Sequence, residues 1–174
     1  INEFAPESFK GKKGEIFSIH TQGKCPSTYV LAVGFGAEKD LDYDIIRECS
    51  AKAIKKCIEL KAKTVAFDYQ TELGYDFASL IGASVANYHF DKYKTKKEHK
   101  ISEVLISNTT ESVVERARTF AQSIEMTRNI ANEPAAYATP TKLAQIASEI
   151  KGLETEIFDE KQIKEQGMNA YLAV

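Results

Sequence analysis

The sequence lacks the features that mark a membrane, secreted or nucleic-acid-binding protein. No apolar run approaches the roughly 20 residues that span a bilayer, and residues 1–13 contain no hydrophobic segment of the kind found in secretory signals. A formal net charge of −2 gives no overall attraction to phosphate backbones. Neither a membrane nor a nucleic acid is therefore expected as a partner.

Cysteine is scarce, and its placement excludes two small-protein frameworks. Cys25, Cys49 and Cys57 are odd in number and form no C-x-x-C pair, so neither a disulfide framework nor a zinc knuckle is predicted. Cys49 and Cys57 are eight residues apart, on one face of an expected helix, where free cysteine packs as a small apolar residue. This usage fits a reducing compartment, and we expect a cytoplasmic protein.

The common hydrolase and metal motifs are also missing. The sequence has no H-E-x-x-H and no G-x-S-x-G, and its three histidines, His20, His89 and His99, are scattered. We expect His89 to lie at a helix end. Within residues 1–174 we therefore assign no catalytic, cofactor-binding or metal-binding residue.

Two charged clusters have simple structural interpretations. Asp40 to Asp44 alternates carboxylates like an EF-hand loop, but the sixth position is Ile45 rather than Gly and the twelfth is Ala51 rather than Glu. Helix capping and the helix dipole explain these acids better. The lysines at positions 92, 94, 96, 97 and 100 are interrupted by acids, which favours a solvated loop.

The order of periodic patterns predicts an α/β fold. Strands are expected at residues 15–20, 28–33, 64–68 and 101–107, and helices at residues 44–61, around 77–88 and at 111–130. The continuous apolar run within residues 28–33 is typical of a central strand covered on both faces. Strands and helices alternate, as in an α/β sandwich.

Beyond residue 131 the pattern predicts the start of a second α/β layer. Thr139 is expected to cap a helix with Pro140 in its first turn and with Gly152 at its C′ position. The apolar residues of this helix, predicted to be buried, are Leu143, Ile146, Ala147 and Ile150. A strand at 155–158, a helix at 161–166 and a strand at 171–174 follow. Because a terminal strand without a partner exposes its backbone, we expect the chain to be the front part of a longer protein.

Three blocks of residues resemble one known family. They are Arg128-x-Ile130-x-Asn132-x-Pro134, then Thr139-Pro140-x-x-Leu143-Ala144, then Gly167-Met168-x-Ala170-x-Leu172-Ala173-Val174. In this order they resemble the M17 family of leucyl (cytosol) aminopeptidases at the junction of its two domains. The family usually has Asn where this chain has Ala136. Over the first 110 residues the resemblance is looser and depends on LAVGFG (31–36) and GASVANYHFDKYK (82–94).

The resemblance implies a domain plan and a reaction. It implies a macro-domain-like mixed sheet sandwiched by helices over residues 1–109, a linker helix at 110–131, and the first elements of a peptidase M17 catalytic domain at 132–174. The intact enzyme would release N-terminal residues from peptides with two zinc or manganese ions, as a homohexamer. The family's metal-binding blocks do not occur in residues 1–174, so we expect this chain alone to bind no metal and to be inactive.

One alternative remains open at this point. Gly34-Phe35-Gly36 lies between a strand and a helix, where glycines let backbone N–H groups approach an anion. No third glycine completes a dinucleotide fingerprint. The alternative is a stand-alone macro-like module that binds ADP-ribose or another nucleotide, and it leaves residues 128–174 unexplained.

Overall fold

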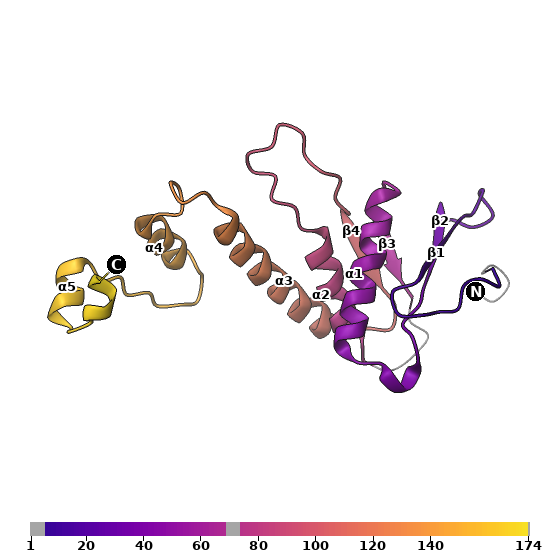
Figure 1. The fold of residues 1–174 in the computed structure, drawn as a ribbon, viewed down its shortest axis with the longest axis horizontal. Coiled ribbons are helices and arrows are strands. Elements are labelled where there is room, and N and C mark those ends of the chain that lie inside the picture. The colour runs from indigo at the N-terminus through magenta and orange to yellow at the C-terminus, as the bar shows by residue number, and fades with distance from the viewer. Residues whose placement is uncertain (1–5, 69–73, 174) are drawn as a thin grey trace. The chain divides into compact units, whose positions relative to one another are not determined.

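A computed structural model describes residues 6–68 and 74–173 (Figure 1). The helices and strands are, in order, β1 (Ile16–His20), β2 (Tyr29–Val33), η1 (Glu38–Asp40), α1 (Tyr43–Glu59), β3 (Thr64–Phe67), α2 (Asp76–Asn87), β4 (Glu103–Ile106), α3 (Glu111–Asn132), α4 (Pro140–Ser148), α5 (Glu160–Glu165) and η2 (Asn169–Leu172). The chain divides into two compact units, Ile1–Asn129 and Ile130–Val174. The mixed α/β class is confirmed. Within the described ranges, no helix is long and apolar enough to cross a membrane.

Two separate strand pairs form the β structure of the first unit. β1 and β2 are antiparallel, with Ile16 opposite Val33, and β3 and β4 are parallel, with Thr64 opposite Glu103. All four predicted strands are thus confirmed. Among the described residues β2 pairs only with β1, and Val30 is 44% exposed. The expectation that β2 is covered on both faces is not met there, because an apolar run does not specify what lies over each face.

The core of the first unit forms where α1 and α2 cross. A Cβ atom on Gly82 of α2 would lie 2.2 Å from the carbonyl oxygen of Arg47 in α1, so only glycine permits this approach. The buried cluster beside the crossing consists of Ile54, Cys57, Ala83, Ala86 and Ile101. Residues of β2, β3 and β4 pack against this cluster.

The acids before α1 cap that helix. Oδ1 of Asp42 accepts a hydrogen bond from the backbone N–H of Ile45 at 2.7 Å, and Asp44 forms an ion pair with Arg47 at 2.8 Å. These contacts satisfy a free backbone donor and place negative charge at the positive end of the helix. The capping interpretation of residues 40–44 is confirmed.

The cysteines lie as their spacing predicts. Cys49 and Cys57 are 0% and 6% exposed, and burial raises the pKa of both thiols. Cys25 is exposed. Buried thiols with raised pKa are poor nucleophiles, so Cys49 and Cys57 act as core residues.

The second unit begins as predicted but buries less than expected. Oγ1 of Thr139 accepts from the backbone N–H of Lys142 at 3.3 Å, with Pro140 in the first turn. No residue of α4 is buried, and Leu143 is 42% exposed, so the predicted buried face is wrong. Gly152 has φ +82°, but the helix cap is Glu149, so Gly152 lies beyond the C′ position.

Two predicted strands in this unit are wrong. Residues 155–158 form no regular element. In place of the strand predicted at 171–174, Asn169–Leu172 form the short 3-10 helix η2. Val174, the last residue of that predicted strand, lies outside the described residues. A strand needs a neighbouring strand for its backbone groups. In η2 the backbone bonds locally: the N–H of Tyr171 donates to the carbonyl of Met168 at 3.1 Å.

Candidate functional site

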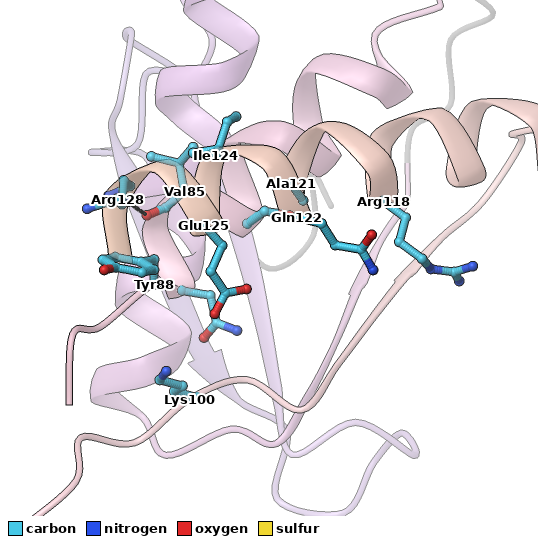
Figure 2. A pocket seen from close by; sticks show the side chains of 11 residues that line it. Val85, Tyr88, Lys100, Arg118, Ala121, Gln122, Ile124, Glu125 and Arg128 are labelled. Atoms are coloured by element: carbon cyan, nitrogen blue, oxygen red, sulfur yellow. Dashed lines mark hydrogen bonds between the residues drawn. The ribbon is translucent and has the colours of Figure 1, made fainter. Parts of the chain in front are cut away.

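The first residue of the signature, Arg128, fastens α3 to the C-terminal end of α2. Its Nη1 donates to the carbonyl oxygen of Val85 at 2.9 Å, and its guanidinium carbon lies 4.0 Å from the centroid of the Tyr88 ring (Figure 2). The Tyr88 hydroxyl donates to Oδ1 of Asn129 at 2.8 Å. We call these four residues the Arg128 latch.

Sequence reasoning treated Arg128 only as part of a motif and did not find the latch. A planar guanidinium can stack on a ring and donate in its own plane at the same time, which an ammonium cannot do. The sequence did show Arg128 near the end of one amphipathic helix and Tyr88 at the end of another. It contains no signal that the ends of these two helices lie next to each other.

A pair of hydrogen bonds from Asn87 also fixes this end of α2. The side-chain amide of Asn87 donates to the carbonyl of Ile101 at 2.8 Å and accepts from the N–H of Ile101 at 2.7 Å. One amide thus satisfies both backbone groups of a 5% exposed residue just before β4. This contact was also not predicted.

A cavity of about 250 Å³ lies beside the latch, between α2 and α3. Apolar, aromatic, amide and charged side chains line it together, which gives it groups of both charge signs (Figure 2). The lining residues are Ser84, Val85, Asn87, Tyr88, Lys100, Arg118, Ala121, Gln122, Ile124, Glu125 and Arg128.

The Gly34-Phe35-Gly36 turn is occupied by the protein's own backbone. The N–H of Gly34 donates to the carbonyl of Glu15 at 2.8 Å, and that of Gly36 donates to the carbonyl of Gly11 at 2.9 Å. A Cβ atom on Gly34 would lie 2.3 Å from the carbonyl oxygen of Lys12. These glycines admit the segment of residues 11–15, and their N–H groups are not available to an anion.

The three histidines make separate structural contacts. Nδ1 of His20 accepts from the N–H of Gln22 at 3.0 Å, and Nε2 of His99 lies 2.6 Å from the carbonyl oxygen of Ala62. His89 follows α2, as predicted, with its Nδ1 2.8 Å from Oε2 of Glu98. Across residues 6–68 and 74–173, no group of three or more His, Cys, Asp or Glu side chains could hold a metal ion.

The lysine-rich loop is partly neutralised by its own acids. Lys94 pairs with Glu98, and its Nζ lies 3.6 Å from Oδ1 of the buried Asp91. The hydrogen bond from Lys94, with a smaller contribution from His89, lowers the pKa of Glu98. The charges of this loop therefore compensate one another, which weakens it as a surface for polyanions.

Comparison with protein families identifies the class of this chain. Residues 4–97 match the N-terminal domain of the cytosol aminopeptidase family, and residues 125–174 match the catalytic domain of the same family. The chain belongs to the cytosol aminopeptidase family. A stand-alone nucleotide-binding module gains no support from these matches.

Individual relatives agree with this assignment. The chain is 36% identical over 185 residues to a probable cytosol aminopeptidase of Persephonella marina, covering 97% of this chain and 37% of the relative. It is also 36% identical over 178 residues to a probable cytosol aminopeptidase of Aquifex aeolicus, with 97% and 36% covered. The chain thus spans little more than a third of the length of these relatives.

Solved structures share the fold. A mutant of tomato leucine aminopeptidase matches with a TM-score of 0.83 at 21% identity, over 97% of this chain and 36% of that one. The bottromycin maturation enzyme BotP in complex with Mn matches with a TM-score of 0.82 at 21% identity, over 96% of this chain and 37% of that one. At this identity the likeness concerns the fold alone.

Proposed function

We propose that this chain is the N-terminal, non-catalytic part of a leucyl aminopeptidase that releases N-terminal amino acids from peptides. The observation that carries the proposal is the order of the two family matches, N-terminal domain and then catalytic domain, along one chain. In the intact enzyme two divalent metal ions would polarise the scissile carbonyl and supply a hydroxide nucleophile.

The chain's own residues do not fit the metal centre. The described residues contain no cluster of three His, Cys, Asp or Glu side chains in metal-binding geometry, and the lysine-and-carboxylate blocks that the family uses do not occur in residues 1–174. No catalytic step is assigned to this chain. Manganese is one candidate for the intact enzyme, since BotP was solved with Mn, and zinc is the other.

We assign three roles along the chain. Residues 1–109 form a macro-like α/β domain that frames the active site, residues 110–131 form a linker helix, and residues 132–174 begin the catalytic domain. The match to the catalytic domain starts at residue 125, inside α3, which supports a helix shared by both regions. A cytoplasmic homohexamer is the proposed assembly.

An assay of the purified chain tests the proposal. We expect no hydrolysis of leucine p-nitroanilide in the presence of either manganese or zinc, because the metal ligands are absent from the chain. The full-length Aquifex aeolicus relative, assayed in parallel, is the positive control. Hydrolysis by the chain that depends on metal and is abolished by a chelator would contradict the proposal.

The exposed apolar side chains of the second unit give an independent test. Tyr137, Leu153 and Tyr171 are 62%, 64% and 73% exposed, and in the intact enzyme we propose that further catalytic-domain residues cover them. Exposed apolar patches promote association. We therefore expect the chain to self-associate as its concentration rises in sedimentation velocity experiments, and a monomer at every concentration would count against this part of the proposal.

A further inference from the structure

We propose that the cavity between α2 and α3 binds a small zwitterion with an aliphatic side chain, of the size and chemistry of an α-amino acid. The cavity lies within the first unit and is formed by α2, α3 and the segment before β4.

The walls of the cavity are held in place by contacts that do not involve a ligand. Asn87 is fixed by both backbone groups of Ile101, Arg128 by Val85 and Tyr88, and the Ser84 hydroxyl by the carbonyl of Leu80 at 2.8 Å. A site whose walls are fixed beforehand loses less conformational entropy when a ligand binds.

Polar groups of both charge signs remain for a ligand. Among the described residues, the side chains of Gln122 and Glu125 of α3 have no hydrogen-bond or ion-pair partner. Within the described part of the chain, the Nζ of Lys100 donates only to the carbonyl of His89, at 3.2 Å, which leaves ammonium donors unused. Figure 2 shows Glu125 extending from α3 toward the side of the cavity where Lys100 lies.

These opposite charges do not neutralise each other directly. No ion pair joins Glu125 to Lys100 in the part of the chain that the structure describes, although both line the same cavity. Arg118, another cation that lines the cavity, pairs with Glu115. A ligand with an ammonium for Glu125 and a carboxylate for Lys100 would satisfy both groups, and charge-assisted hydrogen bonds are the strong ones.

The remaining surface and the size of the cavity define the rest of the ligand. Val85, Ala121 and Ile124 supply apolar surface, and Val85 is 37% exposed. An aliphatic side chain would cover this surface and remove it from water, which favours binding. A volume of about 250 Å³ lies just below the range of roughly 300–1,000 Å³ that is typical of ligand pockets, which favours a ligand much smaller than a dinucleotide.

Titration of the full 174-residue chain with three probes tests the proposal. L-leucine carries both charges, leucinamide only the cation, and 4-methylpentanoate only the anion, with the same aliphatic group in each. We expect leucine to bind with a Kd of about 1 mM, and each singly charged probe to bind about tenfold more weakly. Amide chemical shifts in NMR spectra should change at α2, α3 and Lys100.

Charge-removing variants assign the two ends of the ligand. Glu125→Gln should lower leucine affinity about tenfold and leave 4-methylpentanoate unaffected, whereas Lys100→Met should lower leucine affinity and leave leucinamide unaffected. Glu111→Gln, on the same helix outside the cavity, and Lys96→Met, on the loop, are matched controls that should bind leucine normally.

Three results would overturn the proposal. They are no shift changes with leucine at concentrations well above millimolar, equal binding of the three probes, or shift changes that the controls abolish as effectively as the cavity variants. A dispersed NMR spectrum of each variant confirms that it is folded. Because the intact enzyme's activity is not measured, failure here leaves the proposed aminopeptidase function untouched.

Discussion

The two units of this chain use the same local signals but differ in what they bury. In the first unit α1 and α2 enclose fully buried side chains such as Ile46 and Ile54. In the second unit, none of the residues 130–173 is buried, although α4 and α5 are capped by Thr139 and by the Asp159–Gln162 capping box. Caps therefore define where a helix begins, whereas burial requires a second apolar surface to pack against.

The largest expected effect is a difference in stability loss between the two units when one apolar side chain is removed from each. Ile54→Ala removes a 0% exposed side chain of the core cluster and should lower the free energy of unfolding by about 3 kcal/mol. Leu143→Ala removes a 42% exposed side chain of α4 and should change it by less than about 0.5 kcal/mol.

Urea denaturation followed by far-UV circular dichroism measures both values, because the chain has no tryptophan to report by fluorescence. Equal losses of stability in the two variants would remove the distinction between the units. A large loss for Leu143→Ala alone would mean that α4 has a packing partner within the chain in solution.

The next effect concerns how closely the helices of the first unit approach. Gly82→Ala should lower the free energy of unfolding by about 2 kcal/mol. The new Cβ would lie 2.2 Å from the Arg47 carbonyl oxygen, so α1 would have to move. Gly23→Ala is the control: φ is +79° there, but no atom lies within 4 Å of the added Cβ. Gly23→Ala should lower the free energy of unfolding by about 1 kcal/mol, which is the strain of placing alanine in a left-handed backbone conformation.

Comparison of the two urea midpoints decides this prediction. If Gly82→Ala costs no more than Gly23→Ala, the crossing of α1 and α2 tolerates a side chain, and the close approach is not what requires glycine at position 82.

The same contrast explains which elements could be predicted from sequence. The helices and the strands β1 to β4 were predicted because apolar periodicity and punctuation are local properties. The strands at 155–158 and 171–174 were not formed, because the apolar character of Ile157 or Leu172 does not supply the neighbouring strand that pairing requires. Both wrong strand predictions fall in the unit where none of the described residues is buried.

The site was less predictable than the fold. The signature containing Arg128 identified the family, but its contacts with Val85 and Tyr88 join residues about 40 positions apart, and no local pattern predicts such contacts. The glycine turn at 34–36 was found by sequence, yet its partner, the segment of residues 11–15, has no periodicity. Long-range contacts made by single side chains are therefore what sequence reasoning missed.

A smaller effect is expected at the latch, where the first unit holds α3. Arg128→Lys should lower the free energy of unfolding by about 1 kcal/mol, since an ammonium cannot stack on Tyr88 and donate to the Val85 carbonyl together. The control is Arg118→Lys, which changes an exposed pair with Glu115 and should cost close to zero. Hydrogen exchange should also become faster at residues near Asn129 in the Arg128 variant only, and equal exchange in both variants would contradict the latch.

The smallest expected effect is a pH dependence of the first unit alone. Hydrogen bonds from Lys13 and then Lys52 lower the pKa of Glu48 from 4.5 to about 2. A lowered carboxyl pKa means that the unfolded chain binds the proton more tightly, so this stabilisation is present above pH 4.5 and is lost as the pH falls toward 2. Because Glu48 is 46% exposed, the effect should be small.

Thermal unfolding midpoints of the wild type and Glu48→Gln, measured over this pH interval, test the effect. The two midpoints should converge as the pH falls, because protonation removes the charge that the variant lacks throughout. Glu156→Gln, at an exposed position of the second unit that lies in no helix or strand and in no ion pair of the described residues, should keep a constant offset from the wild type. A constant offset for Glu48→Gln as well would mean that Lys13 and Lys52 do not hold this carboxylate in solution, and that residues 11–15 are held by their backbone hydrogen bonds to Gly34 and Gly36 rather than by the ion pair of Lys13.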